Sequence, residues 1–198
     1  RLAAVLILPD NLRMHYLLVI LASTVLLAGC SRDHVEVSVN PDSGMQTWKT
    51  QQQAFSLELV QLLPDFVRAV FGAKGLPPDV VEAISAYCVF GTIIRNQADE
   101  PISYDMRTWR YVTYDGVEHR ARPKSEWVAQ WREQGIAFRW TLLHEQQTYS
   151  TGDWGQGFTT VLLPPETVFD LHYSWQQGDR THEGIIRGMA CAPATLAD

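Results

Sequence analysis

Short apolar stretches separated by turn residues fill the second half of this chain, a pattern typical of an antiparallel β structure. Several stretches alternate between apolar and polar residues, so each strand would present one face to a core and the other to water. In residues 168–175, for example, Phe169, Leu171, Tyr173 and Trp175 share one face. The predicted strands are residues 87–95, 109–114, 117–122, 136–146, 158–163, 168–175 and 183–191.

Turn residues between these strands indicate how they connect. Asp115-Gly116 is the strongest short hairpin signal in the chain. Ser125 would open a short amphipathic helix that Gly135 ends. The number and spacing of the strands predict a mainly β fold, an antiparallel immunoglobulin-like β-sandwich over residues 86–193. Such a fold by itself assigns no activity.

Residues 51–85 show a helical spacing of apolar residues instead, and we expect them to precede the sandwich as a short helical hairpin. Pro64 would open one helix and Pro78 a second, because proline suits the first turn of a helix. The hairpin would cover an edge or face of the sheet, and a lid over a ligand pocket is the alternative. Residues 30–50 are mostly polar and predict a tether, although residues 34–39 alternate as an edge strand would.

An apolar stretch near the N-terminus ends in small residues and a cysteine. Residues 17–27 are largely apolar and lead into Leu27-Ala28-Gly29-Cys30. The stretch is shorter than the roughly 20 residues that cross a bilayer, and its length is typical of the apolar region of a signal peptide. With its terminal Leu-Ala-Gly-Cys sequence, this region resembles the signal peptide of bacterial lipoproteins.

The resemblance implies that residues 1–29 are removed and that Cys30, carrying a covalent lipid, becomes the first residue of the mature protein. Residues 1–13 would lie upstream of the true start or belong to a longer signal. Ser31 after the cysteine implies sorting to the outer membrane, with the domain facing the periplasm, and retention in the inner membrane is the alternative. An uncleaved anchor or a buried helix is the competing interpretation of the apolar stretch.

The composition is that of a folded domain. Aromatic residues make up 11% of the chain, and its seven tryptophans all follow Cys30, so large apolar side chains are available for a core. The formal net charge of −6 argues against binding to nucleic acid or to anionic lipid head groups. The chain after Cys30 is long enough for one domain and too short for two.

Export would also determine the redox environment of the two remaining cysteines, Cys88 and Cys191. An oxidising periplasm favours a disulfide between Cys88 and Cys191, which would close a loop of about 100 residues. The alternative is a pair of thiolate ligands for copper or zinc. Neither cysteine has a second Cys or His at a short spacing typical of metal sites.

Few motifs in the sequence point to chemistry. It contains no Gly-X-Ser-X-Gly, phosphate-loop, His-Glu-X-X-His, Cys-X-X-Cys or EF-hand pattern. His144, His172 and His182 come from separate predicted strands, and a sheet would have to bring them together before they could bind copper or zinc. Their scattered spacing favours separate surface histidines, so we expect no cofactor other than the covalent lipid at Cys30.

A glycine-rich loop is the main candidate for a binding site. Gly152, Asp153, Trp154 and Gly155 lie in residues 149–157, where glycines let the backbone adopt positive φ angles and present Asp153 and Trp154 in a fixed geometry. Together with Trp140 and Trp175 from the predicted sheet, the loop would offer an aromatic surface to a sugar ring or a partner peptide. The alternative is a structured β-turn whose Trp154 folds back into the core.

Three functions are compatible with these observations. The first is a membrane-anchored, non-enzymatic module that binds or helps to assemble another envelope protein. The second is a module that binds or delivers a small ligand, such as copper or a saccharide. The third is a glycan hydrolase that would pair Asp153 with Glu145 or Asp170, because paired carboxylates cleave glycosidic bonds. We expect the first, and no enzymatic activity.

Overall fold

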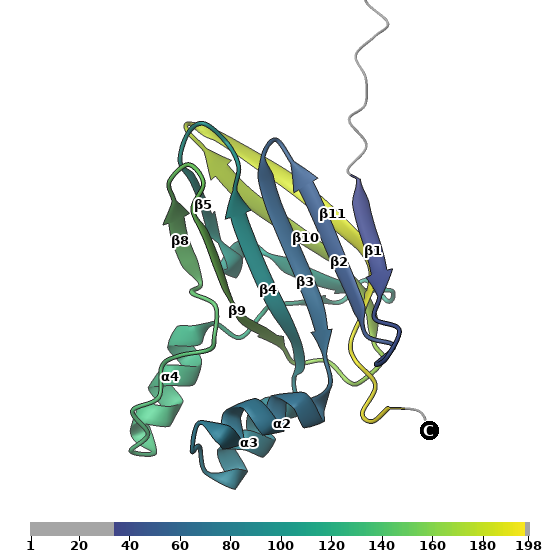
Figure 1. Ribbon diagram of the computed structural model, residues 1–198, viewed down its shortest axis with the longest axis vertical. Coiled ribbons are helices and arrows are strands. Elements are labelled where there is room, and N and C mark those ends of the chain that lie inside the picture. Colours follow the sequence, from purple (N-terminus) through teal and green to yellow (C-terminus); the bar gives the residue numbers. More distant parts are fainter. Residues whose placement is uncertain (1–33, 197–198) are drawn as a thin grey trace, which may run out of the picture. The chain divides into compact units, whose positions relative to one another are not determined.

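The computed structural model describes residues 34–196. Within them, two antiparallel sheets form a sandwich (Figure 1). Sheet A runs in the order β1 (Val35–Val39), β2 (Gln46–Gln52), β3 (Phe55–Leu62), β4 (Cys88–Asn96) and β9 (Trp154–Val161). Sheet B runs in the order β7 (Glu118–His119), β6 (Arg110–Thr113), β10 (Val168–Gln177), β5 (Ile102–Asp105) and β8 (Gln146–Tyr149), with β11 (Arg180–Ala190) paired to β10.

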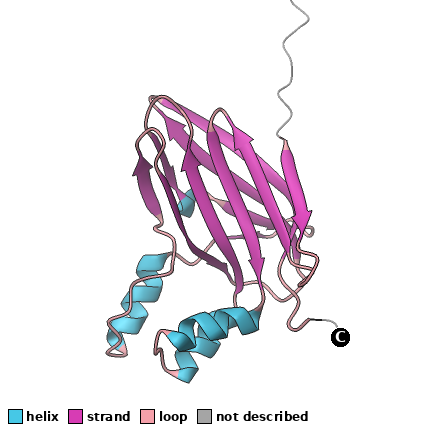
Figure 2. Ribbon diagram, in the orientation of Figure 1, coloured by secondary structure: helices cyan, strands magenta, loops and turns pink. Residues whose placement is uncertain are grey.

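Three α-helices gather at one end of the sandwich, as Figure 2 shows. They are α2 (Pro64–Ala73) and α3 (Pro78–Ser85), which connect β3 to β4, and α4 (Lys124–Glu133). A short 3-10 helix, η1 (Met106–Thr108), connects β5 to β6. In the part of the chain that the structure describes, no helix combines the length and apolar character needed to cross a membrane.

Large aromatic side chains fill the space between the two sheets. The alternation predicted for β10 is confirmed, because Phe169, Leu171, Tyr173 and Trp175 are all buried. The ring of Trp175 stacks on that of Phe55 from sheet A, with 4.6 Å between their centroids. Each such side chain contributes about 1.5–3 kcal/mol by leaving water. The inter-sheet core therefore provides most of the apolar burial of the fold.

A second apolar cluster joins the helices to sheet A. Trp127 and Trp131 of α4 are almost completely buried there, and the Trp127 indole donates a 2.9 Å hydrogen bond to Thr160 Oγ1 on β9. The cluster comprises Val67, Phe71, Leu76, Val80, Val81, Ile84, Val89, Trp127, Trp131 and Leu142. The helices are thus fixed to one end of the sandwich by packing of their apolar faces.

The sandwich and the three helices agree with the sequence prediction, but the sandwich begins much earlier in the chain than residue 86. The predicted tether at 30–50 contains β1 and most of β2, and the region 55–62, predicted as helical, is β3. In β3 the inward residues Phe55, Leu57 and Leu59 are completely buried, as a period of two requires. Leu62 points outward but is also apolar, because it packs on the helices. The sequence of β3 therefore does not show a clear alternation of apolar and polar residues.

A second difference lies between α4 and β9. Residues 136–146 were predicted as one strand, but they form an irregular segment with an isolated bridge between Leu142 and Phe158. Leu142 packs in the helical cluster and the adjacent Leu143 in the inter-sheet core. These neighbours belong to two different cores, so the apolar residues of this segment reflect packing on two sides and not the alternation of a strand. The short strands β5 and β8 were missed.

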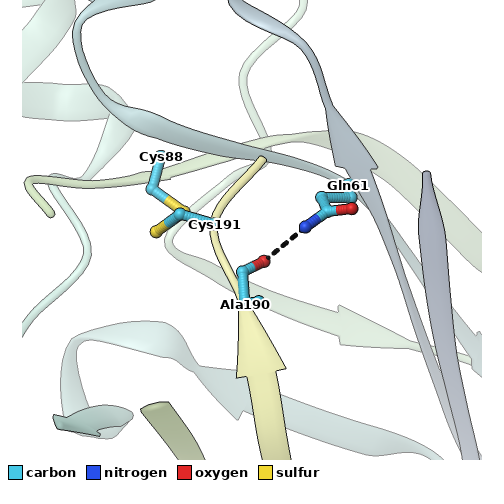
Figure 3. The surroundings of a disulfide bond; sticks show 4 residues. All are labelled: Gln61, Cys88, Ala190 and Cys191. Carbon is cyan, nitrogen blue, oxygen red and sulfur yellow. Dashed lines mark hydrogen bonds between the residues drawn. A yellow bond between two sulfur atoms is a disulfide. The ribbon is translucent and has the colours of Figure 1, made fainter. Parts of the chain in front are cut away.

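The predicted disulfide between Cys88 and Cys191 is present and links the first residue of β4 to the residue after β11 (Figure 3). Their Cα atoms are 5.3 Å apart, and the two residues are separated by 103 positions in the sequence. Beside the disulfide, the buried Gln61 donates a 2.9 Å hydrogen bond from Nε2 to the Ala190 carbonyl (Figure 3). A covalent bond and a hydrogen bond therefore hold the end of β11 against sheet A.

Replacing both Cys88 and Cys191 by alanine should lower the free energy of unfolding by about 2–5 kcal/mol, because the disulfide restricts the unfolded chain over a long loop. Urea denaturation of the two proteins measures this difference. A reductant should destabilise the wild-type protein to a similar extent and leave the double variant unaffected. Equal stability of the oxidised wild type and the variant would contradict the expected contribution.

Candidate functional site

Two of the seven tryptophans in the chain are exposed to solvent. Trp140 and Trp154 keep 66% and 55% of their surface accessible, whereas the other five are almost completely buried. An exposed indole does not gain the free energy that a buried one gains by leaving water. Tryptophans are frequent at the centres of protein interfaces, where binding buries them. The two exposed tryptophans therefore mark the first surfaces to examine for binding.

Trp154 is the first residue of β9 and lies on the outer face of sheet A. It pairs across the strands with Arg95 of β4, and the Arg95 guanidinium carbon is 5.8 Å from the centroid of the indole ring. Arg95 Nη1 also forms a 3.4 Å ion pair with Glu58 Oε2 on β3. A cation over an aromatic face is an attractive contact, so three adjacent strands orient the indole on the surface.

The backbone before Trp154 is a hydrogen-bonded turn. Asp153 accepts a 3.1 Å hydrogen bond at Oδ2 from the Ser150 amide, and the Ser150 carbonyl accepts the Asp153 amide at 3.0 Å. Gly152 adopts a φ of +79°, which favours glycine. The glycine-rich loop is therefore a fixed turn, and the Asp153 carboxylate helps to hold it.

Asn96, the last residue of β4, was not among the predicted site residues, but it connects this turn to its surroundings. Its buried side-chain amide donates to the carbonyls of Glu100 and Tyr149, at 2.9 and 3.0 Å, and its Oδ1 accepts the Ala98 amide. The Asn96 backbone also bonds to Gly152 and Asp153. A buried amide with several partners is costly to replace. The only sequence signal was an asparagine ending an apolar strand.

Next to Trp154, the outer face of sheet A contains a groove of about 400 Å³, which we call the sheet A groove. Gln156 and Phe158 follow Trp154 on the same face of β9, because side chains alternate along a strand. Thr160 lies farther along the same face and accepts a hydrogen bond from Trp127 of α4, so the helices gather at the end of this face away from Trp154 (Figure 1). The groove is lined by Val60, Gly91, Thr92, Ile93, Thr141, Gln156, Gly157 and Phe158.

Glycines on the opposite face of β9 allow close packing beneath the groove. A Cβ atom on Gly155 would meet the Tyr149 hydroxyl, and one on Gly157 would lie only 2.6 Å from the Leu143 Cα. Tyr149 and Leu143 belong to the inter-sheet core. These two glycines thus bring the core against the strand that carries Trp154.

The predicted aromatic surface of Trp140, Trp154 and Trp175 is wrong. Trp175 is 2% exposed in the inter-sheet core, and Trp140 lines a different hollow beside α4. The alternative interpretation of Trp154 as a residue folded into the core is also wrong, because its indole is on the surface. Only the Trp154 part of the predicted site is exposed where it was expected.

The structure does not bring the three candidate histidines together. His172 lies on the exposed face of β10, whereas the His182 ring stacks on buried Trp175, with 5.2 Å between centroids. His144 Nε2 is 3.3 Å from Lys124 Nζ. Within residues 34–196, no three His, Cys, Asp or Glu side chains are grouped so that they could hold a metal ion.

The carboxylates considered for hydrolysis have local partners. Asp153 binds the turn before β9, and Asp170 on β10 accepts the Gly188 amide at 2.9 Å and pairs with Arg187 at 3.2 Å. Glu145 contributes its backbone carbonyl to the Met106 amide. No hydrogen bond found in the described residues joins these carboxylates to one another.

A polar hollow of about 770 Å³ lies along β5, β8 and β10, and its side chains are largely paired with one another. Asp105 Oδ2 accepts hydrogen bonds from Arg107 Nη2 at 2.6 Å and from Gln146 Nε2 at 2.7 Å. These bonds, chiefly those from Arg107, lower the pKa of Asp105 to about 2. Thr108 Oγ1 lies 3.0 Å from Ser174 Oγ. This is the pattern of a solvated sheet face.

No protein-family model matches the chain, and no curated protein shows significant sequence similarity to it.

Gly155→Ala should lower the free energy of unfolding by about 1–3 kcal/mol, because the added methyl group would displace Tyr149 from the core. Gly72→Ala in α2 is the matched control. Its Cβ would meet no atom within 4 Å, so alanine there should be neutral or stabilise by up to about 1 kcal/mol. Thermal denaturation of both variants measures the difference, and equal effects would contradict the close packing at Gly155.

Proposed function

We propose that this protein is a lipid-anchored, non-enzymatic module that binds another protein of the bacterial cell envelope through the Trp154 end of the sheet A groove. The observation that carries the proposal is the exposed indole of Trp154, oriented by Arg95 beside an open groove. An indole that is already fixed loses little conformational entropy on binding.

The side chains around Trp154 have the chemistry of a protein interface. Ile93 and Phe158 give the sheet A groove an apolar floor, and Gln156 adds an amide that can donate and accept hydrogen bonds. Arg95 and Glu58 supply charges at the rim. An apolar centre with a polar rim is the usual composition of a non-obligate interface.

The lipid anchor belongs to the same proposal and rests on the resemblance of residues 1–30 to a lipoprotein signal. Those residues, including Cys30, lie outside the described part of the chain. Cys30 is five residues before Val35, where β1 begins, so extended chain could separate them by at most ~17 Å. β1 and β9 begin at the same end of the sandwich (Figure 1). A lipid at Cys30 would therefore keep Trp154 near the membrane surface, where an envelope partner would meet it.

Trp154→Ala should reduce capture of the partner at least tenfold, because central tryptophans contribute about 2 kcal/mol or more to many interfaces. A photoreactive amino acid replacing Gln156 would crosslink the partner in intact cells, and mass spectrometry would identify it. Tyr114→Ala is the matched control, because Tyr114 is an aromatic residue that is 80% exposed elsewhere.

Both alanine variants should melt within about 2 °C of the wild type, because both side chains are mostly exposed and lie outside the core. Unchanged capture by the Trp154→Ala variant, or no specific crosslink from position 156, would contradict binding at this surface.

Cys30→Ser should abolish the covalent lipid and release the protein from the membrane fraction, because the serine hydroxyl replaces the thiol that would accept the lipid. Labelling cells with an alkyne fatty acid and measuring the mass of the mature protein test both effects. Ser31→Ala is the control and should leave the lipid in place. Fatty-acid label retained on the Cys30→Ser variant would contradict the lipoprotein assignment.

A further inference from the structure

A hollow of about 560 Å³ lies at the C-terminal end of α4, between the helix and the segment that follows it. We call it the α4 hollow. Gly135 reverses the chain there with a φ of +77°, so residues 136–140 turn back beside the helix. The hollow is lined by Val128, Arg132, Gly135, Ile136, Ala137, Phe138, Arg139 and Trp140.

The α4 hollow contains two arginines that form no ion pair within residues 34–196. Ten arginines lie in residues 34–196, and eight of them form ion pairs with carboxylates. The other two are Arg132 and Arg139, both exposed and both in this hollow. In a chain with a formal net charge of −6, two adjacent unpaired guanidiniums form a local site for an anion.

The charge of Arg139 also acts on the partly buried ammonium of Lys124. Burial lowers the pKa of the Lys124 ammonium, Glu145 opposes this shift, and the positive charge of Arg139 lowers the pKa further. The Arg139 guanidinium carbon is also 5.6 Å from the centroid of the Trp140 ring. The indole thus holds the Arg139 guanidinium in place, so this side chain would lose less conformational entropy when an anion binds.

The remaining wall of the α4 hollow is apolar and rigid. The Phe138 ring lies 5.7 Å from that of Trp131 and 6.0 Å from that of Phe71, within the helical cluster. Ile136 is partly buried against the same cluster. A ligand that contacts both the arginines and this apolar wall would combine an anionic group with apolar groups.

We propose that the α4 hollow binds a carboxylate flanked by apolar side chains, presented by an acidic peptide segment of a partner protein. Arginine forms two parallel hydrogen bonds with a carboxylate, and its charge complements an acidic segment. The choice of a peptide over an anionic lipid rests on the proposed anchor at Cys30. α4 lies at the opposite end of the sandwich from the start of β1 (Figure 1), so a lipid there would hold the hollow away from the membrane.

This site extends beyond the proposed function. Trp154 begins β9, whereas the α4 hollow lies beside α4, at the end of the sandwich where the helices gather (Figure 1). One contact would lie near the membrane and the other far from it. A single extended partner, or two partners, would then be engaged at once, with a gain in overall affinity.

The test uses the full-length, acylated protein in discs of neutral phosphatidylcholine. An acetylated peptide of alternating leucine and glutamate, labelled with a dye, is titrated and followed by fluorescence anisotropy. The matched peptide has glutamine in place of glutamate. We expect the glutamate peptide to bind, the glutamine peptide to bind at least tenfold more weakly, and added salt to weaken binding.

Arg132→Gln and Arg139→Gln should each weaken binding of the glutamate peptide about tenfold. Glutamine keeps a good helix propensity in α4, and circular dichroism checks the fold of each variant. Arg180→Gln is the matched control, because Arg180 is an exposed arginine on β11. Its binding should equal that of the wild type, as should that of Trp154→Ala, which separates this site from the proposed interface.

Several results would overturn the proposal. They are no binding of the glutamate peptide, equal binding of the two peptides, unchanged binding by both arginine variants, and competition by glycerol phosphate at concentrations where acetate has no effect. The last result would assign the α4 hollow to phosphate, the chemistry of a lipid head group.

Discussion

The packing of aromatic rings between the two sheets is the constraint on which the rest of the structure depends. Phe55 from sheet A stacks on Trp175 from sheet B, and Trp109 and Tyr173 continue the packing with ring centroids 6.1 Å apart. Rings of this size fix the separation and angle of the two sheets, because close-packed interiors tolerate little displacement. The outer faces of the sheets are therefore rigid surfaces whose side chains keep their relative positions.

Gly155 and the buried side-chain amide of Asn96 connect the surface around Trp154 to this rigid core. Gly155 lets Tyr149 pack beneath β9, and Asn96 holds the Tyr149 carbonyl and the turn at Gly152. The turn before Trp154 is consequently part of the folded core. A surface prepared in this way suits recognition of another molecule, since little order has to be created on binding.

The sequence predicted β4, β6, β10 and β11 well, because β10 and its neighbours alternate with one face in the core and the other in water, whereas the predicted strand at 136–146 was wrong and the short strands β5 and β8 were missed. It failed for β3, where the outward Leu62 also packs in the helical cluster, so that the strand lacks a clear alternation of apolar and polar residues. The sequence left two positions open for Trp154, on the surface or folded into the core, because the outcome depends on contacts of Gly155 and Asn96 with Tyr149 of a distant strand. The lack of ion pairs at Arg132 and Arg139 within residues 34–196 could not be predicted either. Which arginines lie beside carboxylates depends on contacts between residues that are far apart in the sequence.

The two exposed surfaces differ in chemistry and in position, and this difference bears on function. The sheet A groove is apolar with balanced charges, because Arg95 is paired with Glu58. The α4 hollow has an excess of positive charge, because Arg132 lacks an ion pair within residues 34–196. An apolar contact is insensitive to salt, whereas a contact between exposed charges is screened and also accelerates association. The sheet A groove would thus hold a partner and the α4 hollow would attract it, and the rigid core keeps the two surfaces at a constant distance.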